Sequence, residues 1–139
     1  LPHRLEIVKK ENDILWINDS KSTNPHSVLY ALKSFDNKNI ILILGGKNKN
    51  IPFDIIKEEV KKKVKKIIVY GEAGEFLESN LGGLKDIKRV KTVKEAVYEA
   101  KRSSFKGDIV LFSPGLSSFD QYKNYAERGE DFKRWVKEI

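Results

Sequence analysis

Asp19, Lys21 and Thr23 place a carboxylate, an ammonium group and a hydroxyl within five residues of sequence. An apolar run precedes them, and Asn24 and Pro25 follow. Pro25 suits the first position of a helix, which Thr23 or Asn24 can cap. We therefore expect this loop between the carboxyl end of a strand and the amino end of a helix, where free N–H groups and the helix dipole attract anions. An ordinary capped turn with one solvated lysine is the alternative interpretation.

Two further loops carry similar residues. Residues 45–50 read Gly-Gly-Lys-Asn-Lys-Asn and residues 113–118 read Ser-Pro-Gly-Leu-Ser-Ser, and each follows a short apolar run. Ligands of an open parallel sheet bind beyond the carboxyl ends of its strands, so we expect all three loops on one edge. There the lysines, hydroxyls and glycines would form an electropositive rim for a small ligand with carboxylates or phosphates. Each loop alone is also compatible with simple turn chemistry.

The spacing of apolar residues predicts the elements that position these loops. Two short strands, at 5–10 and 14–17, flank a turn and suit a hairpin. Beyond residue 25, helices alternate with short apolar runs that are typical of strands buried on both faces. This predicts one Rossmann-like α/β domain, with a mostly parallel sheet, helices on both faces and an antiparallel N-terminal strand pair. The expected helices are 25–35, 54–64, 73–81, 92–102 and a last one ending the chain, and the later strands are 40–44, 67–70, 87–90 and 109–112.

The composition excludes several classes of protein. With 40% hydrophobic and 34% charged residues, the 139-residue chain is expected to form a single globular domain. It has no apolar run approaching the ~20 residues of a membrane span, so we expect no membrane partner. The absence of cysteine excludes disulfides and thiolate metal sites and, with no signal-peptide pattern, favours the cytoplasm. The absence of methionine predicts a piece of a longer protein.

The net charge of +7 makes nucleic acid a candidate partner. Residues 57–66 hold six of the lysines, with Ile56, Val60 and Val64 at helical spacing. This pattern puts the lysines on the outer face of an amphipathic helix, without the aromatic residues of RNA-recognition motifs. A solvated helix face is the preferred interpretation, and we expect no nucleic-acid partner.

The chain lacks the usual parts of a complete nucleotide site. It contains neither G-x-x-x-x-G-K-[ST] nor G-x-G-x-x-G, two common phosphate-binding loops. His3 and His26 are too isolated in the sequence to predict a metal site. Glu72 and Glu75 fit a helix start, where acidic residues are favoured anyway. The sequence therefore looks like half of an active site.

Four stretches form a more specific pattern. They are Leu-Pro-His-Arg at residues 1–4, Trp-Ile-Asn-Asp-Ser-Lys-Ser-Thr-Asn at 16–24, Leu-Gly-Gly-Lys-Asn-Lys at 44–49, and LFSPGLSSFDQYKNYAERG at 111–129. Together they resemble the C-terminal domain of the Mur ligases, and within that family the branch that adds D-glutamate. The resemblance covers the whole chain, residues 1–139.

This resemblance implies an enzyme of three domains, in which this chain is the closing, amino-acid-binding C-terminal domain. The N-terminal domain would hold the UDP sugar, and the central domain would carry the phosphate-binding loop and most of the contacts to Mg2+. The implied reaction is an ADP-forming ligation. ATP phosphorylates the carboxylate of UDP-N-acetylmuramoyl-L-alanine, and the amine of D-glutamate then displaces phosphate. The isolated domain is expected to be inactive.

The resemblance also implies residue roles by position. Arg4, Asp19 and Lys21 match residues that contact ATP, and Lys21 matches the lysine beside the reacting phosphate. The sequence departs from the family pattern at Gly115 and Leu116, where Ala-Cys or Ala-Gly is usual, and has Tyr125 in place of Phe. The residues that match the D-glutamate pocket are Thr23, Lys49, Ser118, Phe119 and Tyr125.

Two alternatives stay open. The chain could be the C-terminal domain of another Mur ligase or of a folylpolyglutamate synthase, although it lacks the Asp-Asn-Pro-Arg motif of the diaminopimelate-adding ligase. It could also be a non-catalytic, basic α/β binding module.

Overall fold

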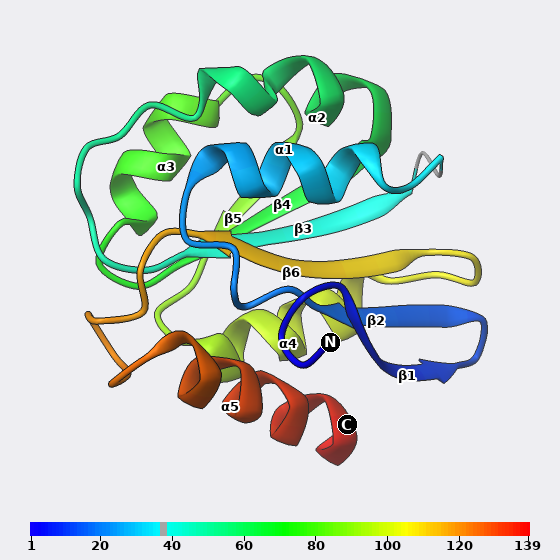
Figure 1. Ribbon diagram of the computed structural model, residues 1–139. Coiled ribbons are helices and arrows are strands. Elements are labelled where there is room, and N and C mark those ends of the chain that lie inside the picture. Colours follow the sequence, from blue (N-terminus) through cyan, green and yellow to red (C-terminus); the bar gives the residue numbers. More distant parts are fainter. Residues whose placement is uncertain (37–38) are drawn as a thin grey trace.

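A six-stranded sheet forms the centre of the protein. The computed structural model describes residues 1–36 and 39–139. The strands are β1 (Glu6–Glu11), β2 (Ile14–Asn18), β3 (Ile40–Gly45), β4 (Val64–Tyr70), β5 (Asp86–Arg89) and β6 (Ile109–Gly115). They lie in the order β1-β2-β6-β3-β4-β5, with β1 antiparallel to β2 and every other neighbouring pair parallel (Figure 1). The predicted N-terminal hairpin and parallel sheet are confirmed.

Helices cover both faces of this sheet. They are α1 (Pro25–Lys33), α2 (Lys57–Lys63), α3 (Gly74–Leu81), α4 (Val93–Ser103) and α5 (Tyr125–Glu138). The first three lie on one face, and α4 and α5 lie on the other (Figure 1). The predicted Rossmann-like α/β architecture is therefore confirmed. Within residues 1–36 and 39–139, no helix is long and apolar enough to cross a membrane.

The central strands are apolar throughout because each of their faces meets a layer of helices. On β3, Leu42 and Leu44 pack into the cluster with α1, α2 and α3, whereas Ile41 and Ile43 pack into the cluster with α4 and α5. β4 and β6 alternate in the same way. Burying each such side chain contributes about 1.5–3 kcal/mol, so the two clusters supply most of the driving force for folding.

Side-chain caps set where α1, α4 and α5 begin, the last through Asn124, whose Oδ1 accepts the N–H of Glu127 at 2.8 Å. Asn24, rather than Thr23, caps α1, and its Oδ1 accepts the N–H of Ser27 at 2.9 Å. Thr92 caps α4 by accepting the N–H of Glu95 at 3.2 Å. The Glu95 carboxylate in turn accepts the N–H of Lys91, the residue before the cap, at 2.7 Å.

Two element boundaries differ from the prediction. The helix expected at 54–64 is a 3-10 turn (Asp54–Ile56) followed by α2, and Val64 already belongs to β4, paired with Ile40. Lys65 and Lys66 therefore lie on a strand and not on a solvated helix face. β6 continues through residues 113–115, which were expected in a turn, because Gly115 pairs with Gly45 of β3.

Candidate functional site

Three loops meet at one edge of the sheet, as the sequence predicts. We call them the first loop (residues 19–24), the second loop (45–50) and the third loop (113–118), and the last two begin within the ends of β3 and β6. They leave the carboxyl ends of β2, β3 and β6, which are adjacent and parallel. The N–H of Gly115 donates to the carbonyl of Ser22 at 3.0 Å, and the N–H of Lys47 donates to the carbonyl of Ser117 at 3.0 Å. The third loop is thus hydrogen-bonded to both of the others.

Asp19 is a buried junction within this edge. Its Oδ2 accepts the hydroxyl of Ser113 at 2.8 Å, and its Oδ1 accepts the N–H of Leu5 at 3.1 Å. Burial raises the pKa of Asp19, although these two hydrogen bonds and the charge of Arg4 partly oppose the shift. The carboxylate therefore ties the first loop to the third loop and to the N-terminal segment, where Arg4 is exposed.

Lys21 and Tyr125 are brought together although they are far apart in sequence. The Nζ of Lys21 lies 5.8 Å from the centroid of the Tyr125 ring, within reach of a cation–π interaction. Tyr125 begins α5, and its carbonyl accepts the hydroxyl of Ser20 at 2.7 Å. Lys21 itself is exposed, and its N–H donates to the carbonyl of His3 at 2.9 Å. The ammonium group is therefore free to meet an anionic ligand at the edge.

The other predicted D-glutamate residues occupy all three loops. Thr23 lies exposed on the first loop, Lys49 exposed on the second and Ser118 buried at the end of the third. Phe119 follows directly and is 66% exposed, which is unusual for so large an apolar side chain. Among the residues that the structure describes, no hydrogen bond joins Lys49 to the other predicted residues. The structure thus places these side chains on one edge of the sheet, and Lys49 is the one that the second loop contributes.

Arg128 is a residue of this edge that sequence reasoning missed. It lies on α5, is fully buried and donates hydrogen bonds to the first and third loops. Its spacing held the signal, because Arg128, Phe132 and Val136 follow at i, i+4 and i+8, which puts an arginine on the buried stripe of the helix.

Two other residues play different parts from those expected. Glu72 precedes α3, and its carboxylate accepts the N–H of Asn48 at 2.8 Å, so it supports the second loop. His3, although isolated in the sequence, has polar neighbours in the fold: its ring lies 2.9 Å from the amide nitrogen of Asn18 and 3.4 Å from the carboxylate of Glu130. In the part of the chain that the structure describes, no group of three or more His, Cys, Asp or Glu side chains is arranged to hold a metal ion.

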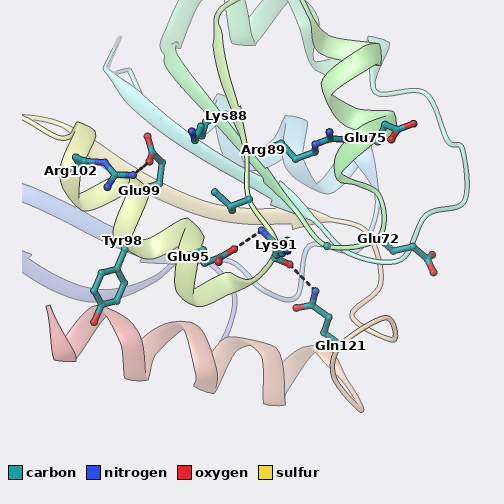
Figure 2. Close-up of a pocket in the computed structure, with 12 residues that line it drawn as sticks. Glu72, Glu75, Lys88, Arg89, Lys91, Glu95, Tyr98, Glu99, Arg102 and Gln121 are labelled. Carbon is teal, nitrogen blue, oxygen red and sulfur yellow. Dashed lines mark hydrogen bonds and ion pairs between the residues drawn. The ribbon is translucent and has the colours of Figure 1, made fainter.

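A pocket of about 800 Å³ lies beside β5 and α4, and Glu72 in its lining also contacts the second loop. Figure 2 shows its lining, which includes the basic side chains of Lys88, Arg89, Lys91 and Arg102 and the acidic side chains of Glu72, Glu75, Glu95 and Glu99. Glu95 accepts the N–H of Lys91, the carbonyl of Lys91 accepts the amide of Gln121 at 2.9 Å, and Arg102 pairs with Glu99. Basic and acidic side chains are equal in number in this lining, so the exposed cations of the loop edge form the better candidate site for an anionic ligand.

Comparison with known proteins identifies the domain. A family model described as "Mur ligase, glutamate ligase domain" matches residues 3–116. UDP-N-acetylmuramoylalanine–D-glutamate ligases of Bdellovibrio bacteriovorus and Salinibacter ruber are 46% and 44% identical to this chain. Each match covers 100% of this chain but only 30% of the relative.

Solved structures of lower identity share the fold. A UDP-N-acetylmuramate-alanine ligase from Thermotoga maritima is 16% identical with a TM-score of 0.65, and the match covers 99% of this chain and 30% of that one. FolC of E. coli in complex with ADP is 23% identical with a TM-score of 0.65, covering 96% of this chain and 32% of that one. With the family match over most of its length, this chain belongs to the Mur ligase family and corresponds to its C-terminal domain.

Proposed function

We propose that this domain is part of an ATP-dependent ligase that adds D-glutamate to UDP-N-acetylmuramoyl-L-alanine in peptidoglycan synthesis. The observation that carries the proposal is the agreement between relatives named for this reaction, at 42–46% identity, and the electropositive three-loop edge. In the reaction, ATP transfers its terminal phosphoryl group to the alanine carboxylate and ADP is formed. The amine of D-glutamate attacks the acyl carbon and phosphate leaves. The nitrogen gives up two protons between the ammonium form of the amino acid and the amide.

Arg4, Asp19 and Lys21 are the proposed contacts to ATP. Lys21 is exposed beside the buried Asp19 on the first loop, where a helix amino end also faces the edge. An ammonium group at this place would stabilise the charge that develops as the phosphoryl group is transferred and released. Asp19 fixes the loop that presents the lysine, through its bonds to Ser113 and Leu5.

Thr23, Lys49, Ser118, Phe119 and Tyr125 are the proposed contacts to D-glutamate. The amino acid has two carboxylates, which require a cation together with hydroxyl or N–H donors. Lys49 supplies a cation, and Thr23, Ser118 and Tyr125 carry hydroxyls on the same edge. The exposed ring of Phe119 offers an apolar surface for the methylene groups between the two carboxylates.

Mg2+ and the phosphate-binding loop are assigned to the central domain of the complete enzyme, and the UDP sugar to its N-terminal domain. Residues 1–36 and 39–139 include no metal-binding group of side chains, and the sequence has no phosphate-binding loop motif. The domain's own contribution is therefore to bind D-glutamate, to place Lys21 at the reacting phosphate and to exclude water when the domains close. We place the complete enzyme in the cytoplasm.

The lysine-rich segment does not favour a nucleic-acid partner. Lys57, Lys61 and Lys63 pair with Asp54, Glu58 and Glu59 respectively. The segment's strand lysines, Lys65 and Lys66, pair with Asp108 and Glu99. These carboxylates neutralise the segment locally. When DNA or RNA binding is measured over a series of salt concentrations, we expect a weak affinity that changes little with salt. A steep decline of affinity with salt would support the basic-module alternative.

The direct test uses the full-length enzyme that contains this domain. ADP release is measured with UDP-N-acetylmuramoyl-L-alanine and D-glutamate, L-glutamate, L-alanine or meso-diaminopimelate in turn. We expect release to depend on D-glutamate. Dependence on another amino acid, or on a folate in place of the UDP sugar, would instead assign the domain to a different ligase of the family.

A further inference from the structure

The guanidinium group of Arg128 lies where the loops of the site converge. Its Nε donates to the hydroxyl of Ser20 at 3.0 Å, and its Nη2 donates to the carbonyl of Ser20 at 2.7 Å. Its Nη1 donates to the carbonyl of Leu116 at 2.8 Å. Ser20 belongs to the first loop and Leu116 to the third. One side chain of α5 therefore spans the two loops that carry the proposed ATP and D-glutamate contacts.

The second loop packs against the same group. A methyl group on Gly46 would lie 3.3 Å from Nη1 of Arg128 and 2.4 Å from the carbonyl oxygen of Ser117. The backbone of Gly46 also has a φ of +135°, a conformation that residues other than glycine rarely adopt. All three loops therefore lie against the guanidinium group, so that its position restricts how the loops can lie relative to one another.

Stability alone does not account for an arginine at this place. Arg128 shares its stripe on α5 with Phe132 and Val136, and burying a charge there is costly. Among the residues that the structure describes, no carboxylate forms an ion pair with it, and its partners are two carbonyls and a hydroxyl. A packed apolar side chain commonly serves stability as well as a buried charge does. What arginine adds is a rigid, planar set of donors that fixes the geometry of its acceptors.

We propose that Arg128 is a positioning residue for the ligation: it holds the first and third loops at the separation that aligns the D-glutamate amine with the acyl phosphate. This inference rests on the proposed function and deepens it. Misalignment of reacting atoms by roughly 1 Å lowers rates by about 10²-fold. If the amine is misaligned, water attacks the acyl carbon in its place, phosphate leaves, and the original carboxylate is regenerated. ADP then accumulates without a matching amount of amide.

The experiment measures amide formed per ADP released in the full-length enzyme carrying Arg128→Lys. Lysine keeps the charge but lacks the fork that reaches Ser20 and Leu116 together. We expect the ratio to fall well below that of the wild type, with amide formation slowed by about 10²-fold. Arg134→Lys is the matched control, because Arg134 lies on the same helix with its side chain 64% exposed. It should leave both the ratio and the rate unchanged.

A purely structural role predicts a different result. Loss of folded enzyme lowers ADP release and amide formation in equal proportion, so an unchanged ratio in Arg128→Lys would overturn the proposal. If that variant does not fold, Ser20→Ala is the second test. It removes the acceptor of Nε, together with the hydroxyl that donates to the carbonyl of Tyr125, and leaves the acceptors of Nη1 and Nη2 in place. An unchanged ratio there overturns the proposal as well. A wild-type enzyme without D-glutamate-dependent ADP release would instead refute the proposed function.

Discussion

Lys21 and Lys49 are both exposed lysines of the site edge, but they belong to different loops. In the full-length enzyme, Lys21→Ala should lower kcat by about 10²–10³-fold, because it removes a donor that acts mainly in the transition state. Lys49→Ala should raise KM for D-glutamate by about 10–150-fold, since a charge-assisted bond of ~1.5–3 kcal/mol to a carboxylate is lost. Its KM for ATP should stay nearly constant.

Steady-state kinetics with each substrate varied in turn separates these roles. If Lys49→Ala changes only the ATP parameters, or Lys21→Ala only the KM for D-glutamate, the two assignments are wrong. Lys62→Ala serves as the control, because Lys62 is an exposed lysine on α2 and does not belong to any of the three loops.

Glu99 provides a pH-dependent contribution to stability outside the site. Burial opposes its ionisation, but hydrogen bonds from Lys66 (2.6 Å) and Arg102 outweigh this and lower the pKa of Glu99 from 4.5 to about 2. A lowered pKa in the folded state means that the contribution is complete above about pH 4.5 and is lost as the pH falls toward 2. Glu99→Gln should therefore lower the free energy of unfolding by about 1–2 kcal/mol at pH 7, after allowance for solvent screening.

Urea unfolding of the wild type and of Glu99→Gln at a series of pH values checks this. The difference between them should shrink as the pH is lowered through the acidic range. Glu138→Gln, at the exposed end of α5, should show little difference at any pH. A difference between wild type and Glu99→Gln that is independent of pH would show that the ion pairs do not act through ionisation.

The second loop depends on a glycine at its first turn. Gly46 and Gly83 both have positive φ, but a methyl group on Gly46 would meet the Ser117 carbonyl at 2.4 Å, whereas one on Gly83 would have nothing within 4 Å. Gly46→Ala should therefore cost about 1–3 kcal/mol more in stability than Gly83→Ala, because overpacking is added to the backbone strain that the two share. Thermal unfolding of the isolated domain measures both, and equal costs would mean that the loop can move away from Ser117.

The elements themselves could be predicted well because their signals are local. Asn24 and Thr92 mark helix starts, and the apolar runs of β3 and β6 are typical of strands with two covered faces. The boundary at Val64 was missed because a residue buried at that position satisfies both a helix stripe and the start of β4. Pairing with Ile40 decides between them, and this pairing is a tertiary contact that the local sequence does not contain.

The location of the site could be predicted from the sequence, but the hydrogen bonds that hold its loops in place could not. The rule for open parallel sheets correctly gathered the three loops on one edge. The partners that hold these loops are distant in sequence: Ser113 lies 94 positions from Asp19, and Arg128 lies 108 positions from Ser20. Glu72 likewise supports Asn48 from another element. Residue type and spacing do not reveal such contacts, although an arginine on the buried stripe of α5 is a usable signal.

The domain has a complete core of its own, with one apolar cluster on each face of the sheet. The isolated chain, residues 1–139, should therefore unfold in a single cooperative transition. Tryptophan fluorescence and far-UV circular dichroism should report the same midpoint, since Trp16 is buried in the cluster beside α4 and α5. Separate midpoints would show that the two sides of the sheet unfold independently.

The same isolated chain should not turn over ATP, because it lacks a phosphate-binding loop motif. The measurement is ADP release by the purified domain with all substrates present, compared with the full-length enzyme at equal concentration. Turnover close to that of the full-length enzyme would show that the domain carries a complete nucleotide site.

β6 is the last strand to be synthesised, yet it occupies the middle of the sheet between β2 and β3. In the sheet that the structure describes, a nascent chain ending before Ile109 has two separate fragments, β1-β2 and β3-β4-β5, whose facing edges both await β6. Unpaired, apolar strand edges are the surfaces on which chains aggregate and chaperones bind. The domain is therefore most vulnerable late in its synthesis, when most of its sequence is already outside the ribosome.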